Sequence, residues 1–257
     1  MKKNVLLLLA GSIGLLLVFS SCQKNLDAGK GDEVMGTPLP STTTYCRVDA
    51  IVAMGAPGPA PAFWLVQYDE FENPKAMVTG NAMFGRPNHF FKYDHWHRMV
   101  EYRSEVDNGL FQEWHFYGFD LNGRIAYDSV YFMGQISDPR NAPFARYNTL
   151  EYDNQGRIIR EGQRSYIDNF TSIFWIDYVY NAQGNLSNTG VVYDDKVNLN
   201  RTNDIWQFLR RDYSMNNNFM APSYNSSGYP SSIPGSWVTS SFTSATISYS
   251  CRPSHYF

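Results

Sequence analysis

The stretch LEYDNQGRIIREG, residues 150–162, has the form of two β-strands joined by a tight turn. An aspartate such as Asp153 accepts hydrogen bonds from the backbone ahead of it, and Gly156 suits a left-handed conformation that other residues adopt at a cost. A type I turn with a bulge at that glycine places Tyr152 opposite Ile158. Such an aromatic–aliphatic pair contributes roughly 0.2–1 kcal/mol, so the stretch predicts an antiparallel hairpin.

Copies of this turn recur along the chain, with an aromatic residue first, Asp or Asn second and usually Gly fifth. His97 stands fifth in one copy and tolerates a positive φ better than most residues, whereas Val197 does not, so its turn is expected to differ. The better copies are YDHWHRM (93–99), FDLNGRI (119–125), YDNQGRI (152–158), YNAQGNL (180–186) and YDDKVNL (193–199), and the weaker ones are YDEFENP (68–74) and YNSSGYP (224–230). The residues expected to shape these turns are Asp94, Asp120, Gly123, Asp153, Gly156, Asn181, Gly184 and Gly228.

The segments between the turns alternate between apolar and polar residues, which is typical of antiparallel strands. In FWIDYVY (174–180), Phe174 and Ile176 share the apolar face, and in RMVEYRSEV (98–106) Met99 falls on the polar face. We expect residues 45–257 to form a single all-β domain, an antiparallel β-meander of about ten to twelve strands. The meander is expected to curl into either a half-open barrel or a sandwich.

One segment departs from the strand pattern. NDIWQFLRRDY (203–213) carries Ile205, Phe208 and Leu209 at helical spacing, and Asn203 or Asp204 could cap its start. The sequence therefore predicts one short helix near residues 204–211.

The N-terminus has the form of a lipoprotein signal. Two lysines precede the apolar run 5–18, and small residues lead to Cys22 in the segment VFSSC, which resembles a lipobox. We expect residues 1–21 to be removed, Cys22 to carry lipid, and residues 22–44 to be a flexible tether. The alternative is an ordinary signal peptide with a chance cysteine. The lipoprotein interpretation places the chain in the cell envelope, at the outer membrane. It does not decide between the periplasmic and the surface leaflet.

The turns resemble the YD repeats of Rhs-type and teneurin-type proteins. The order of motifs is similar to that of lipoproteins from Gram-negative gut anaerobes: several YD-like turns, then YDDKVNL, a helical stretch, DYSMNNN (212–218), YNSSGYP and a final strand ending in cysteine. The resemblance covers roughly residues 45–257. It implies an all-β fold and no established activity, because its motifs encode turn geometry.

Few residues suggest chemistry. The net charge of −3 and the lack of a basic block give no electrostatic case for nucleic acid. His95 and His97 could form a metal pair, but they lie at a turn tip without a third ligand at a suitable spacing, so solvated histidines are the simpler interpretation. Asp194 and Asp195 could serve a glycosidase or bind Ca²⁺, but turn capping explains them as well. We therefore expect no catalytic residues, metal or cofactor.

Aromatic residues are numerous: 6 Trp, 18 Tyr and 17 Phe. Most suit cross-strand packing, but Trp96 falls at a hairpin tip and Trp175 on the polar face of its strand. If neighbouring loops do not cover them, such rings can stack on sugars or anchor a protein. The sequence favours a non-catalytic envelope protein that binds a glycan or a protein partner. The alternatives are a carbohydrate-active envelope enzyme and a purely structural envelope protein.

After lipidation of Cys22, the remaining cysteines are Cys46 and Cys251. Each is in phase with apolar residues of the first and last strands, so both thiols should point to the apolar side. A disulfide is expected if the meander curls until these strands are neighbours. The alternative is two buried free cysteines.

Overall fold

The computed structural model describes residues 44–187, 190–219, 221, 223–238 and 240–253, which belong to one compact unit. The predicted signal and lipidation site, and the tether up to residue 43, lie outside these residues. Among the described residues, no helix combines the length and the hydropathy needed to cross a membrane.

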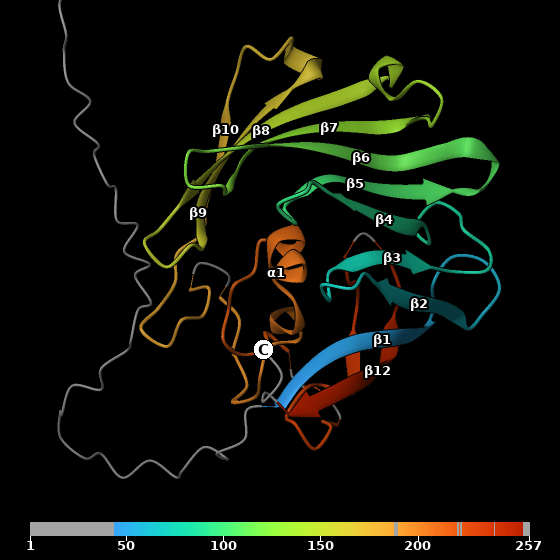
Figure 1. The fold of residues 1–257 in the computed structure, drawn as a ribbon, viewed down its shortest axis with the longest axis vertical. Coiled ribbons are helices and arrows are strands. Elements are labelled where there is room, and N and C mark those ends of the chain that lie inside the picture. The colour runs from blue at the N-terminus through green and yellow to red at the C-terminus, as the bar shows by residue number, and fades with distance from the viewer. Residues whose placement is uncertain (1–43, 188–189, 220, 222, 239, 254–257) are drawn as a thin grey trace, which may run out of the picture. The chain divides into compact units, whose positions relative to one another are not determined.

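Twelve strands form one sheet, in the order β10-β9-β8-β7-β6-β5-β4-β3-β2-β1-β12-β11 (Figure 1). Every pair of neighbours is antiparallel, which confirms the predicted all-β meander. The strands are β1 (Thr44–Met54), β2 (Ala62–Tyr68), β3 (Pro74–Val78), β4 (Asn88–Tyr93), β5 (Met99–Val106), β6 (Leu110–Phe119), β7 (Ile125–Gln135), β8 (Phe144–Tyr152), β9 (Ile158–Ser165), β10 (Phe174–Asp177), β11 (Ser232–Pro234) and β12 (Ser244–Pro253). Short 3-10 helices are η1 (Asp107–Gly109), η2 (Pro139–Asn141), η3 (Tyr166–Asp168) and η4 (Leu199–Thr202).

The repeated turns join β2 to β3, β4 to β5, β6 to β7 and β8 to β9, so they line one rim of the sheet. Tyr152 pairs with Ile158, and the first and seventh residues of the other three turns pair in the same way. The fifth residue has a positive φ whether it is Gly156 (79°) or His97 (61°). Gly123, Gly184 and Gly228 have φ of 77°, 80° and 82°.

Each of these four turns is followed by a second irregularity that the alternation did not predict. Tyr93 pairs with Met99, but the next pair is Lys92 with Glu101, so Val100 has no partner. An extra residue at this point shifts the alternation by one, so the residue before it and the residues after it do not lie on the faces that strict alternation assigns to them. Met99 is therefore buried, contrary to its expected place on the polar face. The unpaired residues at the other turns are Lys75, Ala126 and Ile159.

The segment 193–199 forms no such hairpin. The Asp194 backbone N–H donates to the carbonyl oxygen of Asn217, and Val197 forms a bridge with Asn216. The expectation that Val197 would prevent the common turn agrees with this different path.

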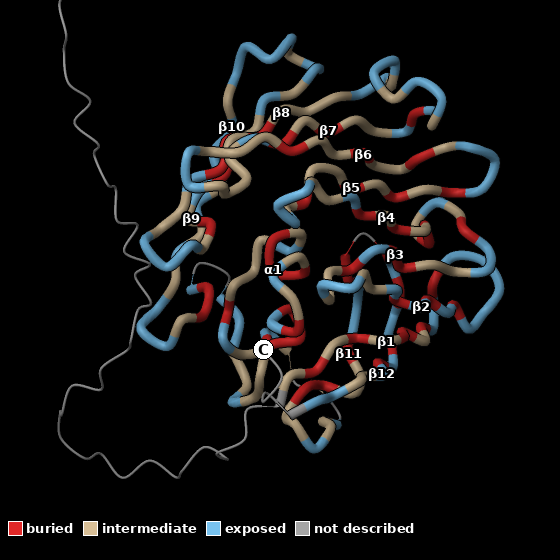
Figure 2. Tube along the Cα trace, viewed as in Figure 1, coloured by how far each residue is buried: buried red, intermediate tan, exposed pale blue. Residues whose placement is uncertain are grey.

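The predicted helix is present as α1 (Asp204–Arg210). The Asn203 side chain accepts a hydrogen bond from the Ile205 N–H and caps it, and Arg211 ends it with a φ of 51°. The sheet curls around α1, which lies in its concavity (Figure 1). Trp206 and Phe208 are buried there, and buried positions on α1 and the central strands form the core (Figure 2).

The sheet neither closes nor splits into two layers. The last strand, β12, returns past α1 to pair with β1, and β10 and β11 remain as the two edges. β10 is an edge strand that pairs with β9 alone, and its Phe174 is 66% exposed, contrary to its expected place on a covered apolar face.

Cys46 and Cys251 lie directly opposite each other on β1 and β12 and form a disulfide across 205 positions of sequence. Cys46 is fully buried, whereas Cys251 is exposed near the end of β12. Directly opposite residues of an antiparallel pair lie on the same face, so both sulfurs share one side of the sheet as expected, but Cys251 is not covered there.

Candidate functional site

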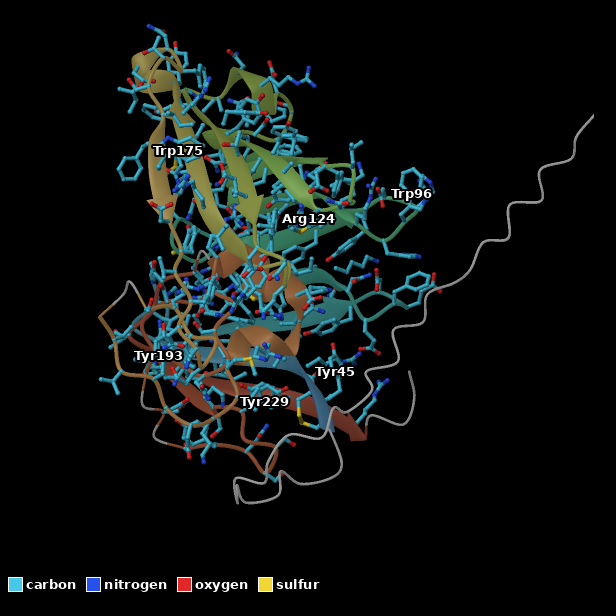
Figure 3. The ribbon with its side chains drawn as sticks, turned by 90° about the vertical axis from the view of Figure 1, so that its left-hand side faces the viewer. Tyr45, Trp96, Arg124, Trp175, Tyr193 and Tyr229 are labelled. Atoms are coloured by element: carbon cyan, nitrogen blue, oxygen red, sulfur yellow. A yellow bond between two sulfur atoms is a disulfide. The ribbon has the colours of Figure 1, made fainter. Side chains whose placement is uncertain are left out.

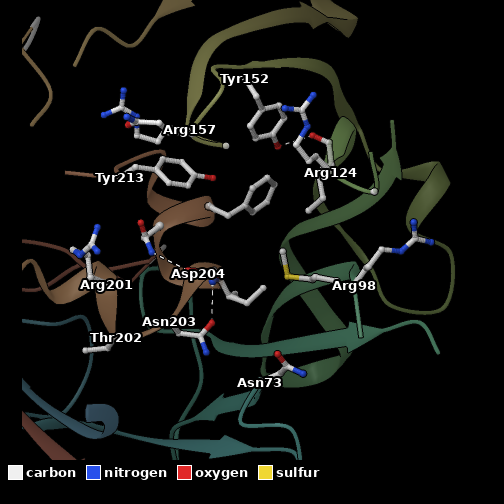
Figure 4. Close-up of a pocket in the computed structure, with 18 of the residues that line it drawn as sticks. Asn73, Arg98, Arg124, Tyr152, Arg157, Arg201, Thr202, Asn203, Asp204 and Tyr213 are labelled. Carbon is white, nitrogen blue, oxygen red and sulfur yellow. Dashed lines mark hydrogen bonds between the residues drawn. The ribbon is translucent and has the colours of Figure 1, made fainter. Parts of the chain in front are cut away.

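An open cleft of about 860 Å³ lies between the row of repeated turns and α1. Figure 4 shows the turn arginines along one wall, with Arg201, Asn203 and Asp204 on the other. Its polar lining comes from Tyr45, Asn73, His97, Arg98, Arg124, Tyr152, Gln155, Arg157, Arg201, Thr202, Asn203, Asp204, Gln207 and Tyr213.

The turn arginines are held by the turns themselves. In the β8–β9 turn, the Asp153 carboxylate accepts hydrogen bonds from the backbone N–H groups of Gln155 and Arg157, both at 2.9 Å. The Arg157 guanidinium then donates back to Asp153, with Nε–Oδ2 at 2.8 Å. Asp94 holds Arg98 and Asp120 holds Arg124 in the same way. One aspartate therefore shapes the turn and also orients an arginine.

Each of these arginines also lies over the aromatic residue that starts the next turn. The guanidinium carbon of Arg157 is 4.2 Å from the centre of the Tyr180 ring. The preceding contacts are Arg98 over Phe119 at 4.0 Å and Arg124 over Tyr152 at 4.9 Å. A guanidinium at this distance is attracted to the ring face. We call this repeated aspartate, arginine and aromatic chain the turn ladder.

Tyrosine hydroxyls add a second link between neighbouring turns. The Tyr152 hydroxyl donates to the Ile125 carbonyl oxygen at 2.7 Å, and the Tyr93 hydroxyl donates to that of Pro74 at 2.8 Å. In both cases the first residue of a turn contacts the seventh residue of the turn before it. The turns are thus bonded side by side, which keeps the cleft wall continuous.

Electrostatics in the turn ladder favours ionised aspartates. Desolvation would raise the pKa of the Asp153 carboxyl, but hydrogen bonds from Arg157 and Gln155 lower it below its ordinary value. Backbone and side-chain bonds from Arg124 likewise lower the pKa of Asp120. Each pair of a turn aspartate and a turn arginine carries no net charge. The turn ladder therefore adds to the cleft planar guanidinium groups that can form hydrogen bonds, but little net charge.

Arg201 differs from the turn arginines. It is exposed on η4 and forms no ion pair with any residue that the structure describes. Asp204 is the acidic residue among those lining the cleft. A glycosidase of the usual kind needs two carboxyl groups about 5–10 Å apart, and this lining supplies one. The cleft therefore suits binding better than that chemistry.

A buried ion network joins the end of α1 to the sheet. Arg211 contacts Asp128 of β7 (Nη2–Oδ2 3.4 Å) and Glu161 of β9 (Nε–Oε2 3.2 Å). His115 Nδ1 lies 3.0 Å from the same Asp128. Burial would lower the pKa of the His115 imidazole, but Asp128, with Glu113, raises it to about 9. The carboxylates are almost fully buried, so the network fixes α1 against the sheet and does not face the cleft.

Sequence reasoning missed this network. His115, Asp128 and Glu161 lie on three different strands and Arg211 directly follows α1, and no spacing pattern relates them. They meet because β6, β7 and β9 curl around α1.

The two tryptophans predicted to form a ligand surface are both exposed, Trp96 by 64% and Trp175 by 44%. Figure 3 places them on opposite sides of the molecule, so they do not form one surface. Trp175 covers Gly162, where an added Cβ would lie 2.7 Å from its ring. Trp96 stands at the tip of the β4–β5 turn, beside the Arg98 guanidinium at 4.7 Å.

The other candidates take structural positions. Asp194 accepts hydrogen bonds from Asn217 and from the Tyr224 hydroxyl, so it links two loops. His95 and His97 are exposed turn residues. Within the described part of the chain, no three His, Cys, Asp or Glu side chains are grouped to hold a metal ion.

The chain matches no protein-family model, and no curated protein matches it either.

Proposed function

We propose that this chain is a non-catalytic lipoprotein of the cell envelope, anchored through Cys22, that binds a glycan in the cleft between the turn ladder and α1. The observation that carries the proposal is the cleft lining, in which fixed guanidinium groups, amides and tyrosines surround an open space of about 860 Å³. Planar groups of this kind form paired hydrogen bonds with hydroxyls and carboxylates, and tyrosine rings pack on sugar faces.

The turn ladder supports this proposal because it positions the arginines before any ligand arrives. A side chain that is already fixed loses less entropy when it binds. Arg98, Arg124 and Arg157 are each bonded to an aspartate and packed on a ring, so their positions are set by the sheet. Arg201, which is exposed across the cleft, is suited to an acidic group of the ligand.

A protein partner is the second candidate, favoured by the open edge of the sheet at β10. The Tyr178 N–H donates to the Ile159 carbonyl oxygen of β9, so by alternation the backbone groups of Trp175 face away from β9. Phe174 and Trp175 are exposed beside this edge. An extended segment of another protein could pair there.

A glycan array probed with the mature protein tests the proposal. The variant that tests the site is Met215→Trp. Met215 lines the cleft and is 44% exposed, so a larger side chain should fill the cleft without disturbing the core. Met54→Trp is the matched substitution at an exposed methionine outside the cleft. We expect the wild-type protein to bind a glycan on the array. Met215→Trp should lower the affinity for this glycan at least tenfold, whereas Met54→Trp should leave it unchanged.

Other outcomes favour the rivals. Turnover of an array glycan would show an enzyme. Glycan binding that both variants retain would place the site elsewhere, and no binding to any glycan would leave the protein-partner and structural alternatives.

A further inference from the structure

The tips of the repeated turns differ in a way that the turn geometry does not require. Three consecutive turns carry a large apolar side chain at the tip: Phe71 (53% exposed), Trp96 (64%) and Leu121 (107%). The next tip along the rim carries Asn154 and Gln155 instead. Since adjacent turns are two strands apart, the three apolar tips follow one another at roughly 10 Å along the rim.

The chain enters the sheet at the same rim. β1 begins at Thr44 and runs antiparallel to β2, so its start lies at the end of β2 where the first repeated turn begins. Arg47 of β1 forms an ion pair with Glu72 in that turn, and the Tyr68 hydroxyl donates to the Val48 carbonyl oxygen. The three apolar tips are therefore on the turns nearest to the point of entry, and the polar tip is farther away.

We propose that this rim rests on the lipid bilayer, with Phe71, Trp96 and Leu121 inserted among the headgroups. The inference rests on the lipid anchor at Cys22 in the proposed function. Residues 22–43 precede the first described residue, and the sequence predicts a tether there; a random-coil tether of about 20 residues would span on the order of 25 Å. An anchor that close keeps the rim from which the chain emerges near the membrane.

The chemistry of the tips fits a lipid surface. Exposed apolar side chains that are grouped on one surface mark a site of contact with a protein or a membrane, and tryptophan is enriched where hydrocarbon meets headgroups. The ion pairs formed by Asp94 and Asp120 neutralise the charge of the arginines behind the tips. Contact should therefore depend on apolar insertion more than on anionic lipid. The cleft borders this rim, so its ligand would be held close to the bilayer.

Tryptophan quenching tests the proposal on the mature, lipidated protein reconstituted in phosphatidylcholine vesicles, with or without brominated acyl chains. We expect brominated lipid to quench the wild-type protein and Trp175→Phe equally, because Trp175 lies far from the rim. Trp96→Phe should lose most of that quenching. The double variant Phe71→Ser/Leu121→Ser should reduce quenching at least twofold, whereas Gln155→Ser at the polar tip should not.

Equal quenching of wild type and Trp96→Phe, or no quenching at all, overturns the proposal. Flotation of the protein with the vesicles is measured in parallel and reports the anchor. If the protein floats but is not quenched, the proposed rim contact is wrong and the lipid anchor is supported. If the protein does not float, both proposals are wrong. The glycan array is run without membranes, so it judges the cleft separately.

Discussion

Replacing Gly156 with valine should destabilise the protein by about 1–3 kcal/mol, although the new side chain meets nothing. Gly156 has a φ of 79°, and a Cβ built there finds no heavy atom within 4 Å. A left-handed conformation costs a residue other than glycine on the order of 1–3 kcal/mol, and branching at Cβ places valine in the upper part of this range. Valine also makes the unfolded chain less flexible than glycine does, which stabilises the folded state by about 0.4–1 kcal/mol. The strain is the larger of the two effects, so the variant should be less stable overall.

Two control variants separate strain from other effects. Gln155→Ala changes the exposed neighbour in the same turn and should shift the free energy of unfolding by less than about 0.5 kcal/mol. His97→Gly acts at the equivalent position, where φ is 61°. Relief of strain there should roughly cancel the greater freedom of the unfolded chain, so the net change should also stay within about 0.5 kcal/mol.

Urea denaturation measures all three variants, with the midpoint compared at constant slope. The reasoning is refuted if Gly156→Val costs no more than Gln155→Ala. A loss from His97→Gly as large as that from Gly156→Val would equally show that side-chain contacts, and not φ, decide stability at this position.

Four further predictions concern other parts of the chain. The pKa of His115 is raised to about 9 in the folded state, so stability should fall by about 3 kcal/mol as pH rises from about 6.5 to 9, and His115→Gln should flatten this slope in urea titrations at each pH. Cys46→Ser should cost about 5 kcal/mol in the chain-entropy model, and thiol trapping in the envelope should find no free thiol in the wild type. Cys22→Ser should release the protein from the membrane fraction and lower its mass by the acyl groups; an unchanged mass and location would contradict lipidation. Tyr152→Phe should cost about 0.5–1.5 kcal/mol, because the Ile125 carbonyl oxygen loses its hydroxyl partner.

The hairpins could be predicted because their cause is local. Asp153, Gly156 and the offset between Tyr152 and Ile158 are fixed by the geometry of one turn, and the same holds for α1 with its cap at Asn203. The residue left unpaired after each seventh position, such as Val100, could not be predicted from alternation, since either register satisfies the turn itself.

The cleft and the turn ladder depend on contacts between turns. Arg124 reaches Tyr152 because two hairpins lie side by side in the sheet, and the sequence does not state their spacing in space. The recurrence of arginine at the sixth position of three turns was a signal that could have indicated this contact. The position of β12 beside β1 likewise follows from the return of the chain past α1, and the turns give no information about it.

Hydrogen–deuterium exchange with and without an array-identified glycan tests most directly whether the cleft is the binding site. Ligand in the cleft should slow exchange of backbone amides in two separate segments, the β8–β9 turn at 153–157 and the segment 201–208 on the opposite wall. Slowed exchange confined to β10, or no change in either wall while the glycan is bound, would contradict the proposed site.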